Sequence, residues 1–167
     1  MLRISLDLDD TLFDWINTHC KKFNMISLNG ISSETITKQV NSCRNDKIFW
    51  ENLPLIERPN FIPECYCTKR INKKIYTKNC LLKHNLPLKP IYQIYTQTRS
   101  KADLIKGRCD VLVDDSYNNV MQCIDDGLPA LLISRPHNIH IQTTLRINNL
   151  NYSEIEQAYE RNGFKST

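Results

Sequence analysis

Apolar residues follow two different periods along the chain, and the change of period divides it. Residues 2–8, "LRISLDL", alternate apolar and polar positions as a strand does. From there to about residue 60, apolar residues recur at helical spacing without a strand pattern. From residue 64 onward, short apolar strands alternate with helical segments. This alternation predicts a parallel α/β sheet with helices on both faces.

The elements expected on each side of this change can be placed from their patterns. The helical stretch predicts helices over 11–25 and 32–43 and a short one in KIFWENLPL, stopped by Pro54. The remaining strands are predicted in ECYCT, IYQIY, DVLVDD and PALLIS, and the remaining helices in NKKIYTKNCLLKHN, SKADLIKG, YNNVMQCIDDG and 151–161. We therefore predict a core formed by residues 1–12 and 61–167, with residues 13–60 as a helical insert after the first strand.

Composition and charge are those of a globular protein. The chain has 167 residues, 41% hydrophobic and 24% charged, with a net charge of +4, and no apolar run reaches the roughly 20 residues that span a bilayer. The seven cysteines lack the C-x-x-C spacing of zinc and redox sites, and no signal-peptide pattern is visible. We expect a soluble, cytoplasmic protein with reduced core thiols. Its scattered basic residues favour a solvated surface or a small anionic substrate over nucleic acid.

Acidic residues gather where two predicted strands end. Asp7, Asp9 and Asp10 follow the first strand, and Asp114 and Asp115 end the strand VLVDD. Ligands of open parallel sheets bind beyond the carboxyl ends of the strands, so both groups should lie at one edge. The carboxylates would repel one another unless a cation lay between them, and oxygen ligands without His or Cys indicate Mg²⁺. The spacing of Asp7 and Asp9 lets one carboxylate attack while the other moves a proton.

Four ordered motifs resemble those of the haloacid dehalogenase superfamily of phosphatases. The motif D-x-D-x-[TV] is matched by "DLDDT" at residues 7–11, the motif-two Ser or Thr by Thr68, the Lys by Lys101, and the acidic pair by Asp114-Asp115. The resemblance implies a Rossmann-like, three-layer parallel sheet with a small helical cap, here residues 13–60. It also implies Mg²⁺-dependent hydrolysis of phosphomonoesters through an aspartyl-phosphate.

The resemblance implies a role for each motif residue that meets the substrate. Asp7 would be the nucleophile, and Asp9 would protonate the leaving alcohol and then activate water. Thr68 and Lys101 would hold the phosphoryl oxygens, with Lys106 as the alternative lysine. Phosphoryl transfer needs mainly positioning and neutralisation of oxygen charge, which suits such a set.

The metal would lie between the two acidic groups. The resemblance implies Mg²⁺ bound by Asp7, by the backbone carbonyl of Asp9 and by one carboxylate of the last pair. Asp115 aligns with the usual ligand, and Asp114 is the alternative. Aspartate also favours helix starts, so a capping role is the competing interpretation, above all for Asp10 or Thr11.

A narrower resemblance concerns specificity. The stretches FWENLPL, CYCT, TRSKADL and VLVDDS are similar to the 5'(3')-deoxyribonucleotidase group, in which an aromatic pair of the cap stacks on the nucleobase. Phe49 and Trp50 occupy the matching place, and packing against the core is an equal alternative for both rings. Lys69 and Arg70 stand where that group has a small hydroxyl residue and a proline. They would bind a further substrate phosphate, reshape the pocket mouth or lie at the surface.

Three functions follow from these patterns. The first is a 5'-nucleotidase acting on (deoxy)nucleoside monophosphates. The second is a phosphatase of nucleic-acid termini or of another small phosphate ester. The third is a non-catalytic binding module, which the presence of both Asp7 and Asp9 disfavours. For the scattered histidines, surface or packing roles are favoured: His19, His84, His137 and His140.

Overall fold

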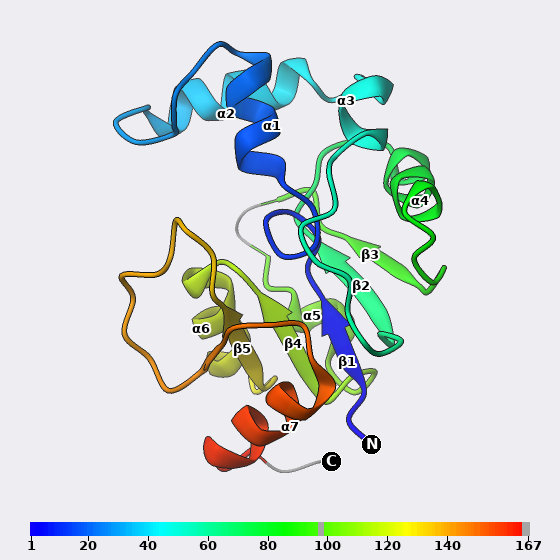
Figure 1. Ribbon diagram of the computed structural model, residues 1–167, viewed down its shortest axis with the longest axis vertical. Helices are drawn as coiled ribbons and strands as arrows, with labels where there is room; N and C mark the ends of the chain where they lie inside the picture. Colours follow the sequence, from blue (N-terminus) through cyan, green and yellow to red (C-terminus); the bar gives the residue numbers. More distant parts are fainter. Residues whose placement is uncertain (97–98, 165–167) are drawn as a thin grey trace.

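The centre of the molecule is a six-stranded, fully parallel sheet in the order β3-β2-β1-β4-β5-β6 (Figure 1). This sheet confirms the predicted parallel α/β architecture. The computed structural model describes residues 1–96 and 99–164, so Thr98, in the stretch TRSKADL, lies outside them. Its strands are β1 Ile4–Leu6, β2 Cys65–Thr68, β3 Ile91–Gln93, β4 Val111–Asp114, β5 Ala130–Ile133 and β6 Arg146–Ile147.

Helices cover both faces of this sheet. One buried cluster joins Leu81 of α4 and Ile155 of α7 to Val113 of β4. A second cluster joins Val120 of α6 to Leu112, the neighbouring residue of the same strand. Successive strand side chains point to opposite faces, so these clusters are the two halves of a three-layer core. The covering helices are α4 (Lys74–Lys83), α5 (Ala102–Ile105), α6 (Tyr117–Asp125) and α7 (Tyr152–Arg161).

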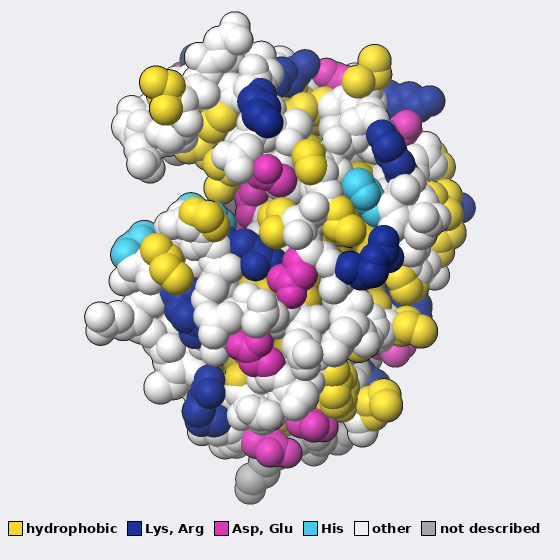
Figure 2. Space-filling model, in the orientation of Figure 1, with side chains coloured by type: hydrophobic (Ala, Val, Ile, Leu, Met, Phe, Trp, Pro, Cys, Tyr) yellow, Lys and Arg dark blue, Asp and Glu magenta, His cyan; other side chains and the backbone are white. Residues whose placement is uncertain are grey.

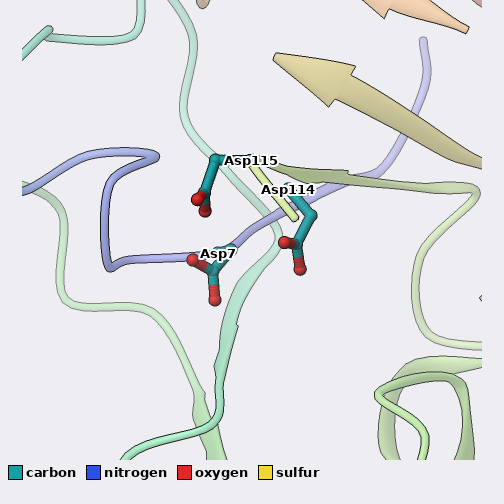
Figure 3. A group of neighbouring side chains, drawn as sticks. All are labelled: Asp7, Asp114 and Asp115. Atoms are coloured by element: carbon teal, nitrogen blue, oxygen red, sulfur yellow. The ribbon is translucent and has the colours of Figure 1, made fainter. Parts of the chain in front are cut away.

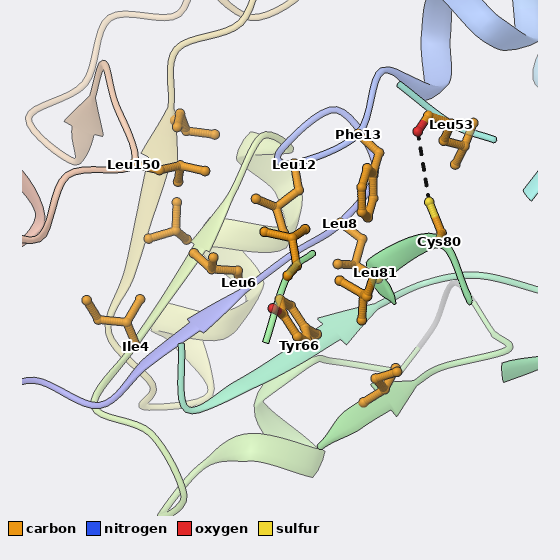
Figure 4. Close-up of a cluster of buried hydrophobic side chains, with 14 of the residues drawn as sticks. Ile4, Leu6, Leu8, Leu12, Phe13, Leu53, Tyr66, Cys80, Leu81 and Leu150 are labelled. Carbon is orange, nitrogen blue, oxygen red and sulfur yellow. Dashed lines mark hydrogen bonds between the residues drawn. The ribbon is translucent and has the colours of Figure 1, made fainter. Parts of the chain in front are cut away.

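The first cluster continues past the end of β1 into the loop that follows (Figure 4). Leu6, Leu8 and Leu12 have no exposed surface and pack with Tyr66 of β2. Full burial of a leucine side chain contributes about 1.5–3 kcal/mol each. The apolar positions on both sides of the acidic residues therefore anchor this loop to the core.

The segment between β1 and β2 contains three helices and no strand of the sheet. These helices, which we call the cap, lie beyond the carboxyl ends of the strands (Figure 1). The two chain segments that connect the cap to the core run antiparallel, because Asp14 N donates to Pro54 O at 2.9 Å and Ile56 N donates to Leu12 O at 2.7 Å. The cap thus leaves and re-enters the core at one place. Its helices are α1 (Trp15–Lys22), α2 (Ser33–Ser42) and α3 (Lys47–Glu51).

The first cap helix begins later than the sequence pattern predicts. The amides of Leu12 and Phe13 both donate to Leu8 O at 2.9 Å, so this stretch forms a tight loop rather than a helical turn. The helix starts at Trp15, after Asp14 as its N-cap. The prediction of a helix from residue 11 is therefore wrong at its start. Leu12 is apolar because the loop buries it, and not because it lies on a helix.

The structure also bears on the predicted core thiols and on membrane-spanning segments. All seven cysteines are buried with free thiols, as predicted for core residues. Within the described residues, no helix is long and apolar enough to cross a membrane.

Candidate active site

Asp7, Asp114 and Asp115 come together at the carboxyl edge of the sheet, where β1 and β4 end (Figure 3). One oxygen from each carboxylate can be chosen so that all lie within 4.8 Å of one another. The strands fix this arrangement, because Asp7 N donates to Val113 O at 2.9 Å. Three carboxylates without a His or Cys ligand are a donor set that fits Mg²⁺.

The two aspartates of the last pair have different surroundings. Asp114 is fully buried, and its oxygens accept from Lys101 Nζ at 2.6 Å, from Ser116 N at 2.9 Å and from Asn119 Nδ2 at 3.2 Å. Asp115 instead lines a cavity between the core and the cap. Its two oxygens contact Thr11 Oγ1 at 3.1 Å and His137 Nε2 at 3.0 Å. Asp115 is therefore the more accessible carboxylate of the pair.

Lys101 places a cation between the two strand ends. Its buried ammonium donates to Asp7 Oδ1 and to Asp114 Oδ2. Burial alone lowers the pKa of Lys101, but the carboxylates of Asp114 and Asp7 outweigh it and raise that pKa. Burial raises the pKa of Asp7, and the lysine opposes this effect. Lys106, the alternative lysine, is exposed and donates to Asp126 O at 2.7 Å, away from the carboxylates.

Thr68, the last residue of β2, contributes a buried hydroxyl. Thr68 has no exposed surface, and its Oγ1 has no hydrogen-bond partner within the described part of the chain. Such a group costs about 1–3 kcal/mol unless a ligand or water satisfies it. Thr68 also lines the same cavity as Asp7 and Lys101, so a bound oxygen atom would satisfy it.

Arg70 engages Asp9, the second aspartate of the first motif. Arg70 Nε donates to both carboxylate oxygens at 3.0 and 2.9 Å, and Nη2 donates to Oδ1 at 2.6 Å. The Arg70 side chain is fully buried, whereas that of Asp9 is 23% exposed. Arg70 is therefore not a surface residue, and two of its guanidinium nitrogens are taken up by Asp9. Lys69, its half-buried neighbour, donates to Gln122 Oε1 at 3.3 Å.

A cavity of about 300 Å³ lies between these groups and the cap. Figure 2 shows a notch between the cap and the core, with acidic side chains beside it. The core side of the cavity carries the polar residues, and the cap contributes an apolar wall. The polar residues include Asp7, Asp9, Asp10, Thr68, Lys69, Arg70, Lys101 and Asp115, and the apolar wall is Trp15, Ile36, Val40 and Trp50.

The aromatic pair of α3 is split between two environments. Trp50 borders the cavity but is only 2% exposed, and its indole Nε1 donates to Cys43 O at 2.8 Å. Phe49 packs edge-on against Trp50 with ring centroids 4.9 Å apart and faces a separate surface hollow beside Lys22. Both rings belong to the core cluster. Packing therefore accounts for Phe49, whereas Trp50 also forms part of the cavity wall.

Asp10 adopts a strained backbone conformation beside the site. Its φ of 54° is in the left-handed region, which Asp and Asn tolerate better than most residues. Its carboxylate accepts from Ile16 N at 2.9 Å. Burial, together with the nearby charge of Asp115, raises the pKa of Asp10 to about 8. Asp10 thus supports the start of α1, in keeping with the capping interpretation, although Asp14 is the N-cap itself.

No protein-family model and no curated protein matches this chain. Among solved structures, the chain is similar to a haloacid dehalogenase-like hydrolase from Streptococcus pneumoniae, with a TM-score of 0.48 and 14% identity, covering 80% of this chain and 85% of that one. It is also similar to a HAD-superfamily hydrolase from Ehrlichia chaffeensis, with a TM-score of 0.37 and 14% identity, covering 96% of this chain and 94% of that one.

Several residues of the site did not stand out in the sequence. The sequence favours a surface or packing role for His137, whereas in the structure its Nε2 lies 3.0 Å from Asp115 Oδ2. Asn119 bonds Asp114 from the first turn of α6, and Ile36 and Val40 reach the cavity from α2. Asn119 lies five positions after Asp114, so a helix starting directly after the acidic pair was the available signal. The cap residues had no such signal, because their position depends on how the cap packs.

Proposed function

We propose that this chain is a Mg²⁺-dependent phosphomonoester hydrolase that forms an aspartyl-phosphate on Asp7. The observation that carries the proposal is the convergence of Asp7, Lys101 and the unpartnered Thr68 hydroxyl in one cavity. A carboxylate nucleophile, a cation and a free hydroxyl are the groups that phosphoryl transfer requires. The four motifs that resemble the haloacid dehalogenase superfamily support the same assignment.

In the first half of the reaction, an oxygen of Asp7 attacks phosphorus and the bond from phosphorus to the ester oxygen breaks. Asp9 gives its proton to that departing oxygen, so the alcohol leaves neutral. Thr68 Oγ1 and Lys101 Nζ hold the phosphoryl oxygens during the transfer. Lys101 is suited to this task because it already lies against the Asp7 carboxylate.

In the second half, Asp9 takes a proton from water, and the water oxygen attacks the phosphorus of the aspartyl-phosphate. The bond from phosphorus to the Asp7 oxygen breaks, which releases phosphate and restores Asp7. Asp7, Asp115 and the backbone carbonyl of Asp9 would hold Mg²⁺, with Asp114 fixed behind them by Lys101. The metal would neutralise charge on the phosphoryl oxygens.

For the substrate, we favour a nucleoside monophosphate. The apolar wall formed by Trp15, Ile36, Val40 and Trp50 faces the polar groups across the cavity. An organic group attached to the phosphate would lie against this wall, and an aromatic base suits the two tryptophan rings. The resemblance of FWENLPL and its companion stretches to deoxyribonucleotidases supports this choice.

A phosphatase screen tests the proposal. Nucleoside monophosphates, sugar phosphates and 3'- or 5'-phosphorylated oligonucleotides would be offered with Mg²⁺ and with excess chelator, and phosphate release measured. We expect Mg²⁺-dependent release, fastest from nucleoside monophosphates. Faster release from oligonucleotide ends would replace the substrate assignment, and full activity in chelator would overturn the metal assignment. The Asp7→Asn variant is the control for contaminating phosphatase.

A further inference from the structure

We propose that Arg135 is a positioning residue for the acidic site: it holds the loop after β1 in register with the loop after β4. The inference rests on the proposed function, in which groups from both loops bind Mg²⁺. Arg135 follows β5 by two residues and belongs to none of the four sequence motifs.

The first support is the contact between Arg135 and the loop after β1. Arg135 Nε donates to Asp10 O at 2.9 Å, and Nη2 donates to Thr11 O at 2.7 Å. These two residues directly follow Asp9, whose own carbonyl is a proposed Mg²⁺ ligand. The donors of a guanidinium lie in a rigid plane, so contact with two acceptors fixes the acceptors relative to each other. Arg135 therefore restrains the backbone that carries the Asp9 carbonyl.

The second support is the conformation that this contact maintains. Asp10 has a φ of 54°, in the left-handed region. A residue other than glycine keeps such a conformation only where its surroundings determine it. Asp10 N donates to Phe13 O at 2.7 Å, and Asp10 O accepts from Arg135. Both polar groups of this peptide backbone are thus held, and loss of Arg135 would release one of them.

The third support is that Arg135 is itself fixed. Its side chain is only 9% exposed, and each guanidinium nitrogen has an acceptor. Nη1 donates to Ser134 O at 3.0 Å, and Nη2 also lies 3.3 Å from Glu57 Oε2, in the segment that returns from the cap. The other oxygen of Glu57 accepts from Leu150 N at 2.7 Å. A buried side chain held at so many points is a rigid support for the carbonyls it contacts.

The fourth support is a link from the same segment to the other half of the site. Asn138 is 2% exposed, and its Oδ1 accepts from Arg135 N at 3.0 Å. Its Nδ2 donates to Asp115 O at 2.7 Å and to Ile133 O at 2.8 Å. The short segment after β5 thus contacts the loop after β1 through a guanidinium and the loop after β4 through an amide. It sets the spacing between the carboxylate of Asp115 and the groups after β1.

Binding of Mg²⁺ alone tests this role apart from turnover. Isothermal titration calorimetry of the purified protein would give the Kd for Mg²⁺, and the rise in melting temperature on addition of Mg²⁺ would check it. Arg135→Met removes both contacts to the loop after β1. It should raise this Kd by about 10–100-fold, the range typical of residues that orient metal ligands. The Mg²⁺ concentration for half-maximal phosphate release should rise in parallel.

The direction of the change separates positioning from charge. Loss of a positive charge near the carboxylates would by itself make them attract Mg²⁺ more strongly and lower the Kd. Arg135→Lys keeps the charge and can still donate to a carbonyl, so it should bind Mg²⁺ more tightly than Arg135→Met. An effect of charge alone predicts the opposite order. The lysine variant also serves if Arg135→Met fails to fold.

Arg3→Met is the matched control for a general loss of stability. Arg3 Nη2 lies 2.6 Å from Asp110 Oδ1, and both residues precede their strands, at the opposite edge of the sheet. This variant also loses a cation that pairs with a buried carboxylate. It should lower the melting temperature and leave the Kd for Mg²⁺ unchanged.

The outcomes separate the two proposals. In folded Arg135→Met, Mg²⁺ binding as tight as in the wild type or tighter would overturn the role of Arg135 and leave the phosphatase assignment intact. A rise in Kd of the same size in Arg3→Met would also overturn it, because instability alone would then account for the effect. If the wild-type protein neither binds Mg²⁺ nor releases phosphate in a Mg²⁺-dependent manner, the proposed function itself is wrong.

Discussion

The ammonium of Lys101 contacts the carboxylate of Asp7 although the two residues are 94 positions apart in the sequence. The same ammonium contacts Asp114, so one cation joins the ends of β1 and β4. Two carboxylates this deeply buried would not be stable side by side without it. The contact therefore both holds the site together and presents Asp7, the proposed nucleophile, to the cavity.

Replacement of Lys101 should affect both stability and activity. Lys101→Met leaves Asp7 and Asp114 without their cation, and loss of one partner of a buried ion pair costs about 3–5 kcal/mol. We expect a large fall in the free energy of unfolding, measured by urea titration, and loss of phosphate release. Lys106→Met is the matched control, because that exposed lysine contacts only a backbone carbonyl among its described partners. Similar losses in both variants would contradict the assignment of Lys101.

The two aspartates at the end of β4 should respond differently to substitution. Asp115→Asn alters the cavity-facing carboxylate and should raise the Mg²⁺ concentration needed for half-maximal activity at least about tenfold, since loss of about 1.4 kcal/mol of binding corresponds to that factor. Asp114→Asn removes the charge that pairs with Lys101 and should mainly lower the melting temperature. Mg²⁺ titrations and melting curves of both variants measure this. The reverse pattern would make Asp114 the principal ligand.

Trp50, which lines the cavity, and Phe49, which packs beside it in α3, should respond differently to substitution. Trp50→Ala should raise KM for nucleoside monophosphates, because a stacked base contributes roughly 1–3 kcal/mol in single-stranded nucleic acid complexes. It should affect KM for p-nitrophenyl phosphate less. Phe49→Ala, in the ring that faces away from the cavity, should lower the melting temperature without changing the preference between the substrates. If Trp50→Ala affects both substrates equally, the ring serves packing alone.

The raised pKa of Asp10 predicts that the free energy of unfolding depends on pH. Burial raises its pKa to about 8, whereas an unfolded aspartate titrates near 3.9. Between these values the folded state holds a proton that the unfolded state releases, so this residue makes stability fall as pH rises from about 4 to 8.

Asn at position 10 should remove this effect. An amide keeps an acceptor for Ile16 N and tolerates the positive φ. In metal-free buffer, Asp10→Asn should exceed the wild type in stability at pH 8 by about 1 kcal/mol or more, and by less at pH 5, since one pKa unit corresponds to about 1.4 kcal/mol. Denaturant titrations at both pH values measure the difference. Asp125→Asn, at an exposed position, is the control; an equal gain at both pH values would refute the explanation.

The strands that could be predicted are those whose apolar runs are continuous, such as β4 and β5, which are buried on both faces. β6 has only Arg146 and Ile147 and forms by pairing with β5, so its own pattern carried no signal. The sequence pattern predicts too early a start for α1, because hydrophobic spacing does not distinguish a buried loop from a helical turn. Backbone hydrogen bonds to Leu8 decide between them.

The aspartates of the site could be predicted because they lie at or just after the end of a strand. The partners of these aspartates depend on tertiary contacts. Arg70 follows β2 by two residues, and nothing in its neighbourhood in the sequence indicates that it turns toward Asp9 rather than toward solvent. The cap residues that line the cavity also could not be predicted from the sequence, since Trp50 lines it while the adjacent Phe49 does not.

The most direct test of the account is to identify the residue that becomes phosphorylated during turnover. The protein would be mixed with p-nitrophenyl phosphate and Mg²⁺, quenched in acid within the first turnovers, digested and analysed by mass spectrometry. The account predicts a phosphoryl group on Asp7, absent from Asp7→Asn and from samples quenched after the substrate is exhausted. Phosphorylation of a different residue, or turnover by Asp7→Asn at even a tenth of the wild-type rate, would contradict it.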